Sequence, residues 1–186
     1  GFRIKLLGIA TIGSDGIAQR VHPCMVPESS PMAHVDGAFN AVLADGDFVG
    51  RTVFEGPGAG AGPTASAVVG DLIDIARGLR IAPFGVRSSD LVARPAVSIE
   101  DRQGAYYLRL EVRDQSGVLA DVAAHLRNHD VSIESVLQRG RNPGEPVSVI
   151  MTTHETVEAG LAAALKSISA FDAVVEPPCM IRIENL

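Results

Sequence analysis

The second half of the chain, residues 105–186, has a pattern of apolar side chains that restricts the fold more than any other feature. Tyr106–Val112 alternates between apolar and polar residues, which is typical of a strand with one buried face. Val131–Gln138, Val147–Thr153 and Met180–Ile183 read as further strands. Between them, residues 118–126 and 157–168 carry apolar stripes at helical spacing. The predicted order is strand, helix, strand, strand, helix, strand.

This order is that of a ferredoxin-like split βαβ module, in which both helices cover one face of an antiparallel four-stranded sheet. The second face is left to be covered, so we expect self-association through this module. Two local signals refine the prediction. Arg139–Pro146 reads as a polar hairpin loop, and Thr152 with Glu155 reads as a capping box that opens the second helix.

The first half is organised around a glycine-rich patch, Gly56–Pro63, that leads into a helix predicted over Thr64–Arg77. Pro63 suits the first turn of that helix, and Gly78 suits the position just after its end. Cys24–Ala33 reads as a loop because of its prolines. Short strands are predicted over Phe2–Ala10, Ile17–His22, Ala38–Leu43 and Thr52–Glu55.

The sequence therefore predicts an α/β (α+β) chain of three parts. Residues 1–79 form the glycine-loop domain, residues 80–104 form a linker without a sustained period, and residues 105–186 form the ferredoxin-like domain. The chain opens at Gly1 inside a strand-like run, so we expect it to be part of a longer protein.

Two turns could hold a ligand. In the loop Gly56–Pro63, glycines allow backbone amides to approach a ligand, and the following helix start favours an anion. The alternative is a structural strand-to-helix turn with packed glycines. In the turn Asp114–Gly117, Asp114 or Ser116 could cap the next helix, or the free amides could hold the carboxylate of a small ligand.

Several classes of protein are excluded. The net charge is −6 and no basic cluster is present, which argues against nucleic acid and anionic membranes as partners. No apolar run reaches the roughly 18 residues of a membrane span. Cys24 and Cys179 read as structural thiols of a reducing, cytoplasmic compartment. His125 and His129 lie on the solvent edge of a helix, so no metal site is expected, and no catalytic grouping can be assembled.

The motifs together resemble bacterial homoserine dehydrogenase. The resemblance rests on Ile4–Ala10, Arg20–Pro23, Val35–Val42, the Gly-Pro-Gly-Ala-Gly loop, Pro63–Val68 and Gly70–Leu72. Asp114–Leu119 and Val131–Gln138 resemble the ACT domain that follows in this family. The resemblance implies the tail of a mixed-sheet substrate domain followed by a βαββαβ ACT domain.

The resemblance also implies an activity. The family is an NAD(P)-dependent oxidoreductase that interconverts L-homoserine and L-aspartate 4-semialdehyde, on the route to threonine and methionine. The family's Rossmann domain and its catalytic lysine segment have no counterpart here, so no catalytic residue is assigned and this chain alone is expected to be inactive. Gly58, Gly60 and Thr64 are implied to lie near the nicotinamide end of the cofactor, although no tightly bound cofactor is expected on this chain.

For the ACT domain, the resemblance implies an amino-acid feedback effector, threonine, at a homo-oligomer interface. The implied effector residues of one subunit are Asp114, Gln115, Gly117, Val118 and Leu119, with Ile133 and Glu134 from the facing strand. Ser116 departs from the pattern, because such turns often carry Pro. A different class remains open: a stand-alone amino-acid-sensing or dimerisation module without catalysis.

Overall fold

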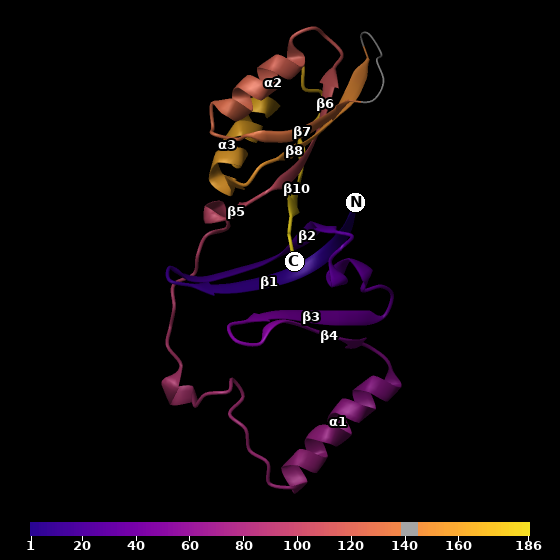
Figure 1. The fold of residues 1–186 in the computed structure, drawn as a ribbon, viewed down its shortest axis with the longest axis vertical. Helices are drawn as coiled ribbons and strands as arrows, with labels where there is room; N and C mark the ends of the chain where they lie inside the picture. The colour runs from indigo at the N-terminus through magenta and orange to yellow at the C-terminus, as the bar shows by residue number, and fades with distance from the viewer. Residues whose placement is uncertain (139–144) are drawn as a thin grey trace. The chain divides into compact units, whose positions relative to one another are not determined.

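The computed structural model describes residues 1–138 and 145–186 (Figure 1). The chain divides into two compact units. The first unit combines Gly1–Pro27 with Pro95–Leu186, and the second unit is Glu28–Arg94. The domain boundaries expected at residues 79 and 104 were drawn from sequence patterns, whereas these units are defined by contacts within the chain. The expected boundaries stay predictions.

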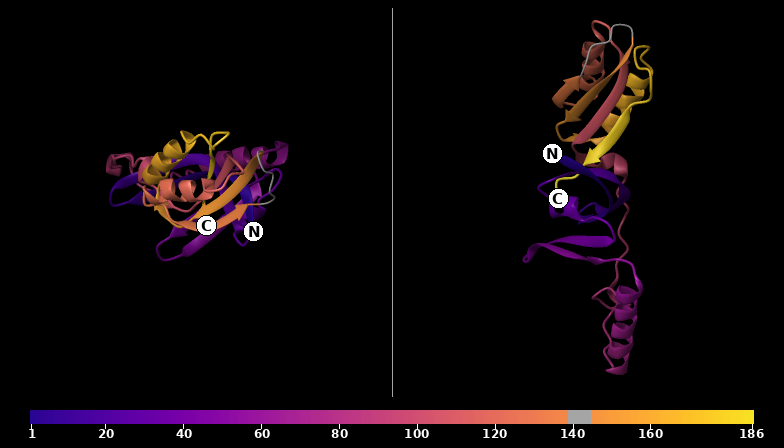
Figure 2. Two further views of the ribbon diagram at one scale, coloured as in Figure 1. Left: turned by 90° about the horizontal axis from the view of Figure 1, so that it is seen from above. Right: turned by 90° about the vertical axis from the view of Figure 1, so that its right-hand side faces the viewer.

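The first unit is built on a six-stranded mixed sheet in the order β1-β2-β10-β6-β8-β7. Four of its strands, with two helices, form the predicted ferredoxin-like module, in which β6 pairs antiparallel with both β8 and β10, and β8 pairs antiparallel with β7. Both helices lie on one face of the sheet (Figure 2). The elements are β6 Tyr106–Arg113, α2 Val118–Arg127, β7 Ile133–Gln138, β8 Pro146–Thr153, α3 Glu158–Ser169 and β10 Cys179–Ile183.

The core of this module follows the alternation read from the sequence. Every second residue of β6 is buried, beginning with Tyr106 and ending with Val112. The helices add the buried stripes Val118–Leu126 of α2 and Leu161–Ile168 of α3. Burying each large apolar side chain contributes about 1.5–3 kcal/mol relative to exposure, so this cluster holds the two helices on the sheet.

The hairpin of β1 (Phe2–Gly13) and β2 (Gly16–Pro27) extends this sheet on one side. β2 pairs in parallel with β10 at Cys24–Arg182 and Met25–Ile183. At the hairpin turn, Gly16 has φ +136°, and a Cβ there would lie 2.2 Å from the carbonyl oxygen of Pro95. The chain between β2 and β6 therefore approaches the hairpin closely enough to require glycine.

The second unit contains η1 Pro31–His34, the β3–β4 hairpin (Phe39–Gly46 and Gly50–Pro57), α1 Ala61–Ala76 and η2 Ser88–Asp90. The predicted helix is confirmed, but it begins at Ala61 rather than Thr64. Gly78, just beyond its C-terminal cap, has φ +72°, as expected for a helix stop. No residue of α1 is buried, so its apolar stripe lies exposed.

Two local predictions are wrong. Cys24–Ala33 is not all loop, since β2 continues to Pro27. The capping box also fails, because Thr152 lies in β8 and its hydroxyl donates to Glu134 at 3.1 Å. The short β9 (Thr156–Val157) then precedes α3, whose N-cap has no side-chain hydrogen bond.

The remaining elements occupy the predicted linker. They are η3 Ile99–Asp101 and β5 Gln103–Gly104, which pairs with β9. The predicted hairpin loop Arg139–Pro146 falls mostly on residues 139–144, outside the described residues. Within the described ranges, no helix combines the length and apolar character that crossing a membrane requires.

Candidate functional site

The first candidate site is the turn between β6 and α2. Gly117 is the N-cap of α2 with φ 95°, and the cap has no side-chain hydrogen bond. Because glycine has no side chain, the N-cap residue itself cannot satisfy the first amides of the helix. The two alternatives for Asp114 and Ser116, a helix cap or a ligand site at the positive end of the helix dipole, stay predictions.

A small cavity of about 40 Å³ lies at this turn. It matches the space of about one water molecule, so a single chain does not enclose room for an amino acid. Four predicted effector residues line it together with strand residues, and Gly117 lies between two of them in the chain. The lining residues are Val112, Arg113, Asp114, Gln115, Val118, Leu119, Gln138, Val147 and Val149.

The other two predicted effector residues lie on β7, away from this cavity. Ile133 lines a separate cavity of about 420 Å³ with residues at the end of α2, such as Arg127. Glu134 accepts the hydrogen bond from Thr152 described above. β7 is an outer strand of the sheet. That these two residues reach the turn from a facing subunit stays a prediction.

The second candidate site is the glycine-rich loop of the second unit. Only Gly58 to Gly60 separate β4 from α1, and Gly60 is the N-cap with φ 123° and no side-chain hydrogen bond. The amide of Thr64 donates to the carbonyl oxygen of Gly60 at 3.2 Å. Gly58, Gly60 and Thr64 thus lie together at an uncapped helix start, which fits the polar end of a cofactor.

Asn40 on β3 is a neighbour of this loop that the sequence did not single out. A Cβ on Gly58 would lie 1.6 Å from the Asn40 side-chain nitrogen. The Gly58 amide donates to the carbonyl oxygen of Ala38 at 3.0 Å. The loop is therefore held against β3, and only glycine leaves room for the Asn40 amide.

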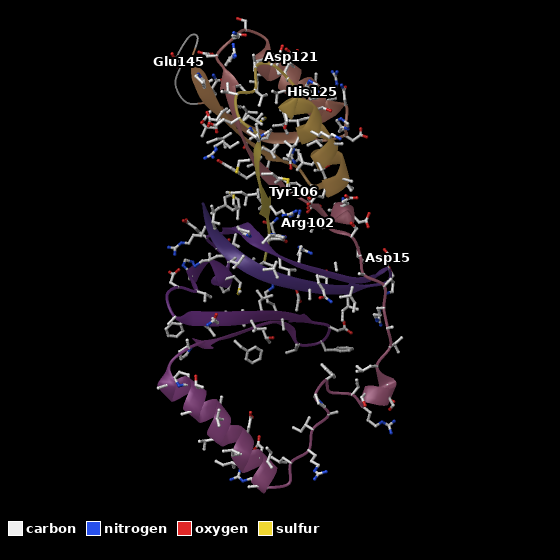
Figure 3. All side chains as sticks on the ribbon, turned by 180° about the vertical axis from the view of Figure 1, so that it is seen from behind. Asp15, Arg102, Tyr106, Asp121, His125 and Glu145 are labelled. Atoms are coloured by element: carbon white, nitrogen blue, oxygen red, sulfur yellow. The ribbon has the colours of Figure 1, made fainter. Side chains whose placement is uncertain are left out.

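A group of buried charges that sequence patterns did not predict lies where the β1–β2 hairpin meets β10. Glu184 accepts from Arg20 Nη2 at 3.3 Å and from Arg102 Nη2 at 3.1 Å. Arg102 also lies over the ring of Tyr106, 4.9 Å from its centre (Figure 3). A network of three charges thus joins β2, the segment before β5, and the residue that follows β10.

A second ion pair stands beside it. Arg182 donates to Glu158 through Nε at 2.8 Å and through Nη2, and the hydroxyl of Tyr106 donates to the same carboxylate. Burial alone would raise the pKa of Glu158, but the Arg182 hydrogen bonds and charge outweigh it and hold the pKa below its ordinary value. The pKa of Tyr106 is raised, chiefly by burial.

Cys24 and His22 form a buried contact next to these charges. The Cys24 sulfur lies 3.1 Å from His22 Nδ1, and their ligand atoms and that of Glu184 lie within 4.8 Å of one another. Burial raises the pKa of Cys24 to about 11. Burial and the Arg182 charge lower the pKa of His22.

This cluster does not fit a cation. The thiol is protonated at neutral pH, and the Glu184 carboxylate is already paired with Arg20 and Arg102. A metal ion would have to displace those guanidinium groups and meet their repulsion. Cys24 and Cys179 are both free, as the sequence predicted.

The fold and the turn after β6 define the class of the chain as an ACT-domain protein. The family model of the ACT domain matches residues 106–172. The family model of homoserine dehydrogenase matches residues 1–73. The chain therefore belongs to the homoserine dehydrogenase family and corresponds to the C-terminal part of its members.

Relatives support this assignment over the whole chain. A homoserine dehydrogenase of Neisseria gonorrhoeae is 41% identical, and one of Pseudomonas aeruginosa is 38% identical. Both matches cover 100% of this chain and 44% of the relative, so the chain spans less than half the length of these relatives.

Solved structures agree. The crystal structure of a homoserine dehydrogenase from Thiobacillus denitrificans has a TM-score of 0.89 and 43% identity, over 100% of this chain and 43% of that one. An S. aureus homoserine dehydrogenase shares the fold, with a TM-score of 0.61 at 20% identity, over 100% of this chain and 43% of that one.

Proposed function

We propose that the chain is the C-terminal part of an NAD(P)-dependent homoserine dehydrogenase, which interconverts L-homoserine and L-aspartate 4-semialdehyde on the route to threonine and methionine. The family match of residues 1–73 supports this proposal. When bound, NAD(P) supplies the hydride chemistry. Gly58, Gly60 and Thr64 would face the nicotinamide end, where the uncapped start of α1 offers amide donors.

The residues that carry out the reaction are assigned to the part of the enzyme outside this chain. The chain alone is therefore proposed to be inactive and to hold no cofactor tightly. A cytoplasmic location is proposed with it, because Cys24 and Cys179 are both free thiols and reducing compartments keep thiols in that state.

The ACT domain is proposed to bind an amino-acid feedback effector, threonine, in a homo-oligomer. The observation that carries this proposal is the turn after β6, where the segment that leads into α2 and a cavity share the residues Asp114, Gln115, Val118 and Leu119. The helix-start amides would hold the effector carboxylate, and the Asp114 carboxylate would hold its ammonium group.

The proposed subunit pairing would account for the small cavity of a single chain. Its volume of about 40 Å³ is short of what an amino acid needs, and a facing β7 would supply the rest through Ile133 and Glu134. Feedback requires that the effector bind one subunit arrangement more tightly than another, because equal binding shifts no equilibrium.

The test is a thermal-shift panel with threonine, serine, isoleucine, methionine, homoserine and lysine. An effector that binds only the folded chain stabilises it by RT ln(1 + [L]/Kd), about 2.7 kcal/mol at a hundredfold excess over Kd. We expect threonine to raise the melting temperature in the wild type and in Asp172→Ala, an exposed control, but not in Asp114→Ala. A panel without any shift would refute the effector proposal and leave a dimerisation module.

A further inference from the structure

We propose that the first unit holds a second ligand site, a cavity of about 250 Å³ that takes a small zwitterion of the α-amino acid class. The cavity lies between the β1–β2 hairpin and the segment that leads into β5. Its lining combines guanidinium, carboxylate, hydroxyl and amide groups with three apolar side chains. The proposal shares no residue with the turn after β6 and does not depend on the function proposed for that turn.

Both walls of the cavity are fixed by backbone hydrogen bonds. At one end, the Ile17 amide donates to Pro95 at 2.9 Å and the Val97 amide donates to Ile17 at 3.0 Å. At the other end, Gln103 pairs with Val157 in the β5–β9 ladder, and the Glu158 amide donates to Arg102 at 2.8 Å. The site is therefore formed before a ligand arrives, as small-molecule sites usually are.

Arg20 and Arg102 supply the positive charge of the cavity. Their side chains are 15% and 7% exposed, and both pair with the single carboxylate of Glu184. The two guanidinium groups and the one carboxylate have a net charge of +1. This buried group of three therefore has an excess positive charge that the carboxylate of a ligand would balance.

The same two arginines have unused hydrogen-bond donors. Arg20 Nε and Arg102 Nη1 are buried, and neither has a partner within the described part of the chain. Buried polar atoms without partners are rare because the loss of their water contacts is unfavourable. A guanidinium group prefers a carboxylate oxygen, so the two arginines, which both line the cavity, are the groups that would bind the carboxylate end of the ligand.

Asp101 gives the cavity its opposite charge. It lines the same space, one residue before Arg102, and is exposed. A ligand with a carboxylate at the arginines and an ammonium group at Asp101 would satisfy both ends, whereas a simple anion would face the repulsion of this carboxylate. The charge pattern therefore favours a zwitterion over phosphate or acetate.

The size of the cavity restricts the ligand further. A volume of about 250 Å³ corresponds to about eight times the share of one water molecule in the liquid. It is below the roughly 300 Å³ at which drug-sized pockets begin. Ala18, Val97 and Ile99 form the apolar part of the wall, so the ligand is an amino acid with a short side chain.

The proposal is tested by following backbone amide resonances of the ¹⁵N-labelled chain during titration with glycine, the smallest ligand of the class. We expect millimolar glycine to shift the amides of residues 97–103 and 18–20. Acetate, methylammonium and inorganic phosphate serve as half-ligands. The proposal is overturned if glycine leaves these amides unmoved, if it shifts only residues 114–119, or if acetate or phosphate binds as tightly as glycine.

Two matched variants locate the site. Ala18→Leu fills the cavity without removing a charge, and we expect it to weaken glycine binding at least about tenfold. Ala10→Leu adds the same bulk at an exposed position of the neighbouring strand, outside the cavity lining, and should leave binding unchanged. Equal binding by both variants would overturn the assignment to this cavity. The amide spectrum also shows directly whether each variant is folded.

Discussion

Replacing Glu184 by Gln removes the one negative charge between two buried guanidinium groups. The carboxylate receives four hydrogen bonds, two from Arg20 at 3.3 Å and two from Arg102 at 3.3 and 3.1 Å. Breaking a buried ion pair from one side costs about 3–5 kcal/mol, mostly because the remaining charge stays buried without a partner. The contacts are long and the side chains keep 7–15% exposure, so we expect about 3 kcal/mol.

The assay is urea unfolding followed by tyrosine fluorescence. The chain has no tryptophan and only two tyrosines, Tyr106 and Tyr107, both on β6 in the first unit, so the signal reports the unit that contains Glu184. With an m-value of about 2 kcal/mol/M, the midpoint of Glu184→Gln should fall by about 1.5 M urea. Glu155→Gln, at an exposed position, is the control.

The result that would refute this reasoning is a Glu184→Gln midpoint equal to that of the control. A double-mutant cycle with Arg20→Gln sharpens the test. If Glu184 acts through Arg20, the second substitution should cost less free energy in the Glu184→Gln background than in the wild type. Additive losses would show that the two side chains do not interact.

Four further outcomes are expected. Cys24, buried and with a pKa of about 11, should react with iodoacetamide at pH 8 only after denaturation, whereas labelling of Cys179 in the native chain should be faster; equal rates would contradict the burial of Cys24. The lowered pKa of Glu158 contributes stability that is present above the unfolded value near 4.3 and is lost as the pH falls through the folded value, so Glu158→Gln should flatten the acid limb of stability below about pH 5. Gly58→Ala should disturb the amide spectrum of the second unit, because its Cβ would lie 1.6 Å from a side-chain nitrogen, whereas Gly56→Ala meets nothing within 4 Å and should not. The purified 186-residue chain should give no homoserine-dependent reduction of NAD(P)⁺ in a spectrophotometric assay, and turnover free of contaminating enzyme would overturn the assignment of the reaction to the rest of the protein.

The local periods of the sequence were sufficient to predict the ferredoxin-like module. Tyr106–Val112 shows why, since its alternation in the sequence is the same alternation that the sheet buries. Prolines were a less reliable signal, because they occur both in loops and in strands. The prolines of Cys24–Ala33 suggested a loop, but the first of them, Pro27, is the last residue of β2, which pairs with β10 only at Cys24 and Met25, so its missing amide breaks no bond of that pairing.

The charged network could not be predicted, because it depends on distances that the sequence does not contain. Arg20 and Glu184 are 164 positions apart, and Arg102 and Glu184 are 82 positions apart. The parallel pairing of β2 with β10 brings Arg20 to Glu184, and the antiparallel pairing of β6 with β10 brings Arg102 there. The turn after β6 is different: Asp114–Leu119 is continuous in the chain, so its position between a strand and a helix was predictable.

The place of β10 in the sheet has a consequence for biosynthesis on the ribosome. β10 follows every other strand and helix along the chain, yet it lies between β2 and β6 in the sheet. Until it leaves the exit tunnel, the two neighbouring strands each have an open edge, and such edges can pair with other nascent chains. The β1–β2 hairpin must therefore wait for β10, and a pause in translation before Cys179 would prolong the period in which the chain is prone to aggregate.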